Sequence, residues 1–232
     1  MTKQYYAILD TETTIDNTVA DFAIVICDKT GSIVDQLAVL ILGEFDKKDL
    51  FYDKTKKENE LWSRQYASKK QCKYFAMLDN GQRSLASVAF INAWIQKAIQ
   101  KYNPSLTAYN LAFDREKCSN TGIDLSGFAD QFCLWQAAFG NLCKKPYRQF
   151  VLENHLFNPV TEKGNMSFKT TAESVFGFLN GTMIKEPHTA LEDARDFELP
   201  ILVAVLRKRN WRDNITAHNW KFVQVKDFYK AI

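Results

Sequence analysis

The stretch ILDTETT (residues 8–14) ends the first apolar run of the chain and decides how the fold begins. Residues 4–9 are predicted to form a central strand, because no charge interrupts the run from Tyr5 to Leu9. Residues two apart on a strand point to the same face, so Asp10 and Glu12 project together at its end. Two neighbouring buried carboxylates repel each other unless a metal ion, a basic partner or a shared proton lies between them. This stretch alone leaves the three alternatives open.

The segments that follow change from strands to helices. Residues 22–27 and 33–42 are β-rich runs joined by a glycine-containing loop, so with the first strand they predict an antiparallel meander. Apolar spacing and capping residues then predict helices over 61–77, 84–103, 111–119, 128–138, 167–179 and 190–206, a strand over 105–109, and a loop over 141–148. This order is typical of an α/β layer fold with a mixed sheet.

Composition narrows the class of protein. The chain has 232 residues, of which 46% are hydrophobic and 25% charged, as in ordinary globular proteins. No apolar stretch approaches the roughly 18 residues of a membrane span, and the N-terminal run lacks a signal-peptide cleavage site. The five cysteines are scattered and suggest neither zinc nor disulfides. We therefore expect a cytoplasmic protein with no membrane partner.

A second acid follows the predicted strand at 105–109. In YNLAFD (residues 109–114), Asp114 lies one turn into the next helix, and Asn110 is expected to cap that helix with its side chain. The cap fixes where the helix begins, so Asp114 is held near the end of the strand. On its own, Asp114 is equally well explained as a first-turn acid favoured by the helix dipole.

The third acidic stretch is PHTALEDA (residues 187–194). Thr189 and Glu192 fit a capping box, so the helix is predicted to begin at the next residue and to carry Asp193 in its first full turn. On one continuous helix, a histidine five residues before an acid would point about 140° away from it. The cap instead leaves His188 on a freer segment, from which its imidazole can swing over the site.

Together these stretches resemble a known family. Its three motifs are matched by Asp10-x-Glu12-Thr, Asn110-x-x-Phe113-Asp114 and His188-x-Ala190-x-x-Asp193, which look like those of the DEDDh (DnaQ-like) 3′–5′ exonucleases. The residues at 128–138 and 166–181 are similar to helices that this family carries between its second and third motifs. The resemblance covers roughly residues 5–206, and it implies a ribonuclease H-like three-layer fold.

The resemblance also implies roles for individual residues. Asp10 would bridge two Mg²⁺ or Mn²⁺ ions, Glu12 and Asp193 would complete the shell of the first, and Asp114 would hold the second. Two such ions clamp the attacking and leaving oxygens of a phosphodiester during hydrolysis. His188 would be the general base that takes a proton from the attacking water. The substrate would be contacted by Thr11, Glu12, Thr13, Asn110 and Phe113.

The expected activity is metal-dependent 3′–5′ hydrolysis of single-stranded DNA or DNA 3′ overhangs, with release of nucleoside 5′-monophosphates. An exoribonuclease that trims RNA ends is the alternative, and a catalytically silent nucleic-acid-binding protein is a third reading. Proofreading would require a separate polymerase or another replication or repair partner.

Two regions depart from the simplest members of the family. We expect residues 1–206 to form the exonuclease domain and residues 207–232 a basic, aromatic-containing extension packed on or beside it. Residues 43–83 are an unusually long basic segment between strand and helix. Both regions either grip a single strand by charge and stacking or are a solvated surface. The aromatic candidates for stacking are Trp62, Tyr66, Phe75 and Trp211.

Overall fold

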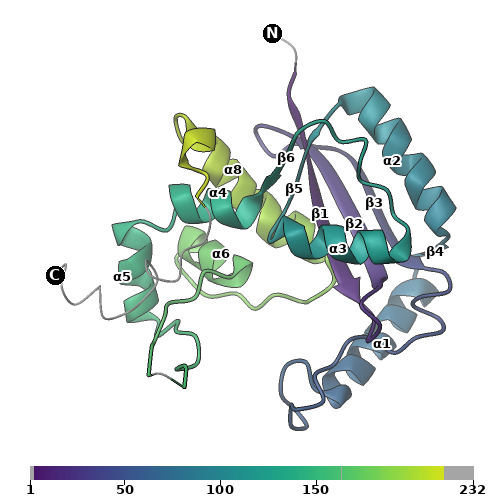
Figure 1. The fold of residues 1–232 in the computed structure, drawn as a ribbon, viewed down its shortest axis with the longest axis horizontal. Coiled ribbons are helices and arrows are strands. Elements are labelled where there is room, and N and C mark those ends of the chain that lie inside the picture. Colours follow the sequence, from purple (N-terminus) through teal and green to yellow (C-terminus); the bar gives the residue numbers. More distant parts are fainter. Residues whose placement is uncertain (1–2, 163, 217–232) are drawn as a thin grey trace.

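A computed structural model describes residues 3–162 and 164–216 of the chain. Its centre is a mixed sheet of six strands in the order β4-β3-β2-β1-β5-β6 (Figure 1). The strands are β1 (Tyr5–Thr13), β2 (Val19–Asp28), β3 (Ile33–Ile41), β4 (Leu85–Ala86), β5 (Ser105–Ala108) and β6 (Gln131–Cys133). The predicted α/β class with an antiparallel meander and then parallel strands is confirmed.

The first strand is longer than predicted. Strand β1 pairs antiparallel with β2 through Thr13, so both Asp10 and Glu12 lie inside the strand, and a register shift follows Glu12. Its other neighbour, β5, runs parallel to it. The carboxyl ends of two adjacent parallel strands therefore meet at the edge where the two acids project, which is where α/β sheets commonly bind ligands.

Helices cover both faces of the sheet (Figure 1). On one face, α2 (Val88–Tyr102) and α3 (Leu111–Thr121) bury apolar side chains against Ala7 and Leu9. The other face, to which Tyr6 and Ile8 of β1 belong, is covered by four helices: α4 (Leu134–Asn141), α5 (Lys145–Glu153), α6 (Ala172–Asn180) and α8 (Leu199–Leu206). The arrangement is consistent with a three-layer ribonuclease H-like fold.

The long segment after β3 has a small core of its own. Helix α1 (Arg64–Asp79) lies beside the carboxyl end of β1 and packs through Tyr74 and Met77 against Leu40 and Phe45. The predicted helix over 61–77 is thus confirmed with shifted bounds. This segment is therefore folded, with helix α1 packed beside the strand that carries Asp10 and Glu12.

Several predicted boundaries were wrong, among them the helix expected from 167, which begins only at Ala172 in α6. Leu85 pairs with Leu40 in β4, and α2 begins only after Ser87, whose hydroxyl caps the helix by accepting from the Phe90 amide. Residues 128–138 are not one helix, because β6 pairs with β5 before α4 begins. The expected loop over 141–148 contains the start of α5, where a proline occupies the first turn.

The helix predicted over 190–206 is interrupted. It consists of α7 (Ala190–Glu192), a π-helical turn η1 (Asp193–Glu198) and α8. Pro200, at the start of α8, has no amide hydrogen to donate to the carbonyl four residues earlier and crowds it, which favours a wider turn just before it.

The beginning of the predicted C-terminal extension packs on the domain. A 3₁₀ turn, η2 (Trp211–Asn214), places Trp211 against Phe132, with ring centroids 4.8 Å apart, and Arg212 pairs with Asp130. Residues 217–232 of that extension lie outside the described residues. Within the residues that are described, no helix is both long and apolar enough to cross a membrane.

Candidate active site

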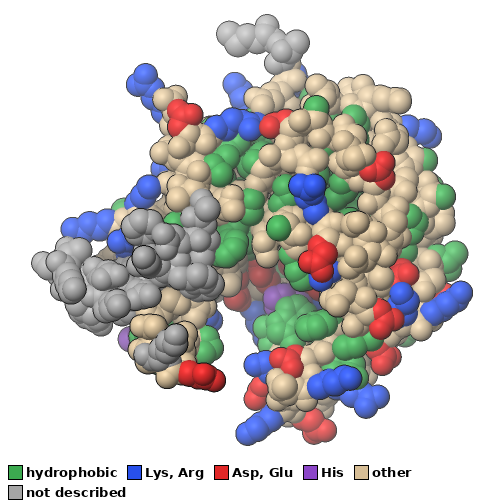
Figure 2. Space-filling model, viewed as in Figure 1, with side chains coloured by type: hydrophobic (Ala, Val, Ile, Leu, Met, Phe, Trp, Pro, Cys, Tyr) green, Lys and Arg blue, Asp and Glu red, His purple; other side chains and the backbone are tan. Residues whose placement is uncertain are grey.

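A pocket of about 480 Å³ opens at the carboxyl ends of β1 and β5. Figure 2 shows the hollow, with acidic side chains and a histidine at its base. Nearly all the residues that the sequence singled out line it: Asp10, Thr11, Glu12, Thr13, Asn110, Phe113, His188 and Asp193. Among the predicted site residues, only Asp114 does not. We call this cavity the acidic pocket.

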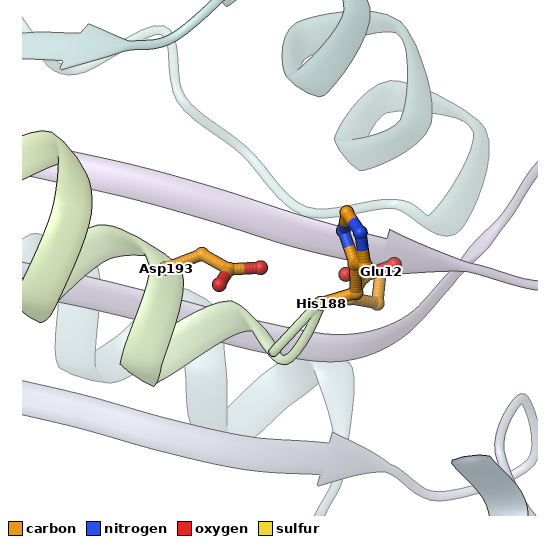
Figure 3. A group of neighbouring side chains, drawn as sticks. All are labelled: Glu12, His188 and Asp193. Carbon is orange, nitrogen blue, oxygen red and sulfur yellow. The ribbon is translucent and has the colours of Figure 1, made fainter. Parts of the chain in front are cut away.

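Three side chains from two distant parts of the sequence meet in the acidic pocket. Glu12 comes from β1, His188 from the loop before α7, and Asp193 from the first residue of the π-turn (Figure 3). One ligand atom of each lies within 4.8 Å of the others. Two carboxylates and an imidazole at this spacing can hold a metal ion together.

Asp114 lies behind this group. Its Oδ1 accepts a hydrogen bond of 2.8 Å from the Thr11 hydroxyl, and its side chain is buried. Burial raises the pKa of Asp114 to about 7, while the Thr11 hydrogen bond opposes the rise. Asp114 also contributes to the raised pKa of Asp10, so the two carboxyl groups interact although one belongs to β1 and the other to α3.

The cap predicted at Asn110 is right in position and wrong in mechanism. Asn110 is the N-cap residue of α3, but it has a left-handed backbone (φ 79°) and its side chain makes no capping hydrogen bond. Asparagine tolerates this conformation better than most residues. Its carbonyl accepts from the Phe113 amide at 2.9 Å, and its freed side chain lines the acidic pocket instead.

The predicted capping box at Thr189 does not form. Thr189 occupies the N-cap position without a side-chain cap, and the carboxylate of Glu192 turns away to Arg83, whose Nη2 lies 2.6 Å from it. Asp21 of β2 fixes the start of α7 instead, because its Oδ2 accepts a hydrogen bond of 2.9 Å from the Ala190 amide.

Asp21 and its partners were missed by the sequence analysis. Its carboxylate accepts hydrogen bonds from the Tyr74 hydroxyl (2.9 Å), Arg83 Nε (3.3 Å) and the Ala190 amide. Asp21 stands opposite Glu12 in the β1–β2 register. A lone acid inside the apolar run of β2 was the available signal. We call these residues, with Glu192, the Asp21 network.

His188, predicted to lie on a freer segment before the helix, contacts two aromatic rings in the structure. Its imidazole packs against both Trp62 and Tyr66, at centroid distances of 5.0 and 6.2 Å. Its backbone is left-handed (φ 52°), which is unusual and costly for histidine. Burial, followed by the nearby positive charge of Lys70, lowers the pKa of His188 to about 4, so the imidazole is neutral near pH 7. A neutral imidazole can accept a proton or bind a metal ion.

The acidic pocket contains two more acids, Glu186 and Glu198, which the sequence analysis also missed. Burial and neighbouring carboxylates raise the pKa of Glu186 to about 7 and that of Glu198 well above its ordinary value. Glu198 lies five residues after Asp193, a spacing that an α-helix would place about 140° around the axis. The π-turn brings both residues to the same cavity.

Lys70 supplies the basic partner that the opening stretch left open. Its ammonium lies 2.5 Å from Glu12 Oε2, and only 8% of its side chain is exposed. Burial nevertheless outweighs this lysine and raises the pKa of Glu12. One lysine therefore does not neutralise the cluster.

The remaining acids of the pocket offer oxygen ligands for a cation. Burial, followed by Glu12 and Glu186, raises the pKa of Asp193 to about 9. Within the described part of the chain, the buried atoms Asp193 Oδ1 and Glu198 Oε2 have no hydrogen-bond partner. Because buried oxygens are normally paired, and carboxylate oxygens are hard ligands, this donor set fits a divalent cation.

Comparisons with known proteins give no independent identification. The chain matches no protein-family model. A search of the curated proteins likewise returned no match for it.

Proposed function

We propose that the chain is a metal-dependent 3′–5′ exonuclease acting on single-stranded nucleic acid, with DNA favoured. The observation that carries the proposal is the convergence of Asp10, Glu12, His188 and Asp193 on one pocket that retains unpartnered carboxylate oxygens. The order of these residues along the chain, and the resemblance of their motifs to DEDDh exonucleases, support this activity over other metal-dependent chemistry.

Each residue has a task in this proposal. Asp10, Glu12 and Asp193 hold Mg²⁺ or Mn²⁺, with Asp114 as a further acid behind them. When bound, such ions polarise the phosphodiester and stabilise the charge on its attacking and leaving oxygens. His188, neutral near pH 7, accepts the proton of the attacking water, and its packing on Trp62 keeps the imidazole in place.

The lining of the pocket supports a nucleic-acid strand as the substrate. Beside the acids, the aromatic side chains that line it are Phe51, Trp62, Tyr109, Phe113 and Trp135. Bases stack on such rings without much sequence preference. Of the stacking candidates, Trp62 lines the pocket and Tyr66 contacts His188, whereas Phe75 and Trp211 pack against Phe45 and Phe132.

The test is a time course on two 5′-labelled oligonucleotides of identical sequence, one DNA and one RNA, with Mg²⁺ or with EDTA. We expect a ladder that shortens from the 3′ end, only with metal, and faster on DNA. Asp193→Asn should abolish cleavage, because it removes a carboxylate from the metal site. Asp196→Asn is the matched control, since Asp196 lies on the same turn but is exposed.

The other outcomes discriminate between the alternatives. Faster shortening of RNA would make the chain an exoribonuclease. Intact oligonucleotides in Mg²⁺ and in Mn²⁺, with binding retained, would contradict the proposed activity and leave the silent binding protein.

A further inference from the structure

Asp114 and Glu198 differ in what their carboxylates face. Asp114, the acid of the second motif, accepts from the Thr11 hydroxyl and does not line the acidic pocket. Glu198 lies in no motif, yet it lines the pocket together with Asp10. The acid expected from the motifs is thus turned toward a protein partner, while an unassigned acid faces the cavity.

Glu198 is also deeply buried and incompletely partnered. The residue is 3% exposed, and its Oε2 accepts no hydrogen bond from any described residue. A carboxylate oxygen kept in this state is costly unless something positive binds it. Arg195, on the same π-turn, is already paired with Asp196. Lys70 is engaged with Glu12.

In the proposed function Glu12 and Asp193, whose ligand atoms lie within 4.8 Å of each other, hold one ion, and Asp10 lies outside that group. The π-turn, widened before Pro200, carries Asp193 at its first residue and Glu198 at its last, and both line the pocket. Besides the group of Glu12 and Asp193, the pocket is therefore lined by two further carboxylates, those of Asp10 and Glu198.

From these contacts we infer that Glu198 is a direct ligand, with Asp10, of a second divalent cation in the acidic pocket. Asp114 then acts from behind, through its hydrogen bond with Thr11 and through its charge. The inference rests on the proposed metal-dependent function, and it assigns to a residue outside the three motifs a role that the motifs give to Asp114.

Counting bound metal tests the inference without measuring activity. Isothermal titration calorimetry with Mn²⁺ alone is performed on the whole chain as wild type, Glu198→Gln, Asp114→Asn and Asp196→Asn. We expect two ions for the wild type and for Asp196→Asn. Glu198→Gln should lose the second binding event and keep the first, whereas Asp114→Asn should keep both, with the second about 10–100-fold weaker.

A fourth variant separates loss of a ligand from loss of structure. Glu198→Asp keeps the carboxylate on a shorter side chain and should regain the second event at lower affinity than the wild type. Circular dichroism checks that each variant is folded at the titration temperature. If Glu198→Gln is unfolded, Glu198→Asp decides alone: a second event as tight as in the wild type would overturn the inference, because a displaced ligand must weaken it.

Two further results would overturn the inference, and they differ in what they say of the proposed function. Two ions in Glu198→Gln and one in Asp114→Asn would return the ligand role to Asp114 and leave the proposed function intact. No Mn²⁺ binding by the wild type would overturn both, and the absence of cleavage in the oligonucleotide assay would agree with it.

Discussion

Two sets of buried carboxylates flank the start of α7, and they differ in their partners. Asp21, fully buried, accepts hydrogen bonds from Tyr74, Arg83 and the Ala190 amide. Asp193 and Glu198, which follow Ala190 in the sequence, each keep a buried oxygen with no partner among the described residues. The buried carboxylate of Asp21 thus has hydrogen-bond donors for its oxygens, whereas the likewise buried carboxylates of Asp193 and Glu198 each have an oxygen without one.

This contrast separates the acid that ties elements of the fold together from the acids that the proposed function assigns to a cation. A buried carboxylate with protein donors ties elements together, as Asp21 ties β2 to α1 and α7. A buried carboxylate oxygen without a donor destabilises the metal-free protein, and burial raises the pKa of both Asp193 and Glu198. Such a group is explained when the protein binds a cation there.

The largest expected effect is on catalysis in the acidic pocket. His188→Asn removes the base while asparagine still tolerates the left-handed backbone at this position. We expect kcat to fall about 10²–10⁴-fold, the usual contribution of a general base. Mn²⁺ affinity, measured by calorimetry, should stay at the wild-type value. An equally large loss of Mn²⁺ affinity would show that His188 is a ligand and not the base.

The next effect is on stability in the Asp21 network. Arg83→Met leaves Asp21 buried without its charged partner, so the free energy of unfolding in urea should fall by about 3–5 kcal/mol. Arg195→Met is the matched control, because it breaks an exposed arginine–aspartate pair and should cost about 1 kcal/mol or less. Equal losses of unfolding free energy in the two variants would contradict the stabilising role of the Asp21 network.

The smallest effect is on the pH dependence of the metal-free protein. The pKa of Asp193 is raised to about 9 and that of Glu186 to about 7, from ordinary values of 3.8 and 4.5. Between the ordinary and the raised pKa of each group, the folded state binds more protons than the unfolded state. The free energy of unfolding therefore falls as pH rises through this range. Thermal unfolding in EDTA should therefore show a melting temperature that decreases from pH 4.5 to pH 8.

A variant sharpens this pH prediction. Asp193→Asn removes a group whose pKa is raised from 3.8 to about 9, so the decrease in melting temperature should become shallower than in the wild type. A melting temperature that rises over this range in EDTA would mean that the acids are already neutralised within the protein.

Sequence reasoning placed side chains correctly where their position follows from local geometry. The period of two on a strand placed Asp10 and Glu12 on one face, and the strand–helix order brought Asp193 and His188 to the same pocket. It failed where the position depends on a distant partner. Glu192 pairs with Arg83, about a hundred residues away, and so no capping box forms.

The missed acids have a different cause. Glu198 belongs to the pocket only because η1 is a π-turn, and the ordinary α-helical period assigns it to another face. Pro200 was the sequence signal for that irregularity. Lys70 looked like one of several lysines on a basic helix, and its burial depends on how α1 packs beside β1.

In the proposed function, the unpartnered acids of the acidic pocket are the ligands of divalent cations. A crystal grown in Mn²⁺ and measured at the manganese absorption edge tests it most directly. We expect anomalous peaks inside the acidic pocket, one between Glu12 and Asp193 and one between Asp10 and Glu198, and none at Asp21. An empty pocket, or a peak at Asp21, would contradict it.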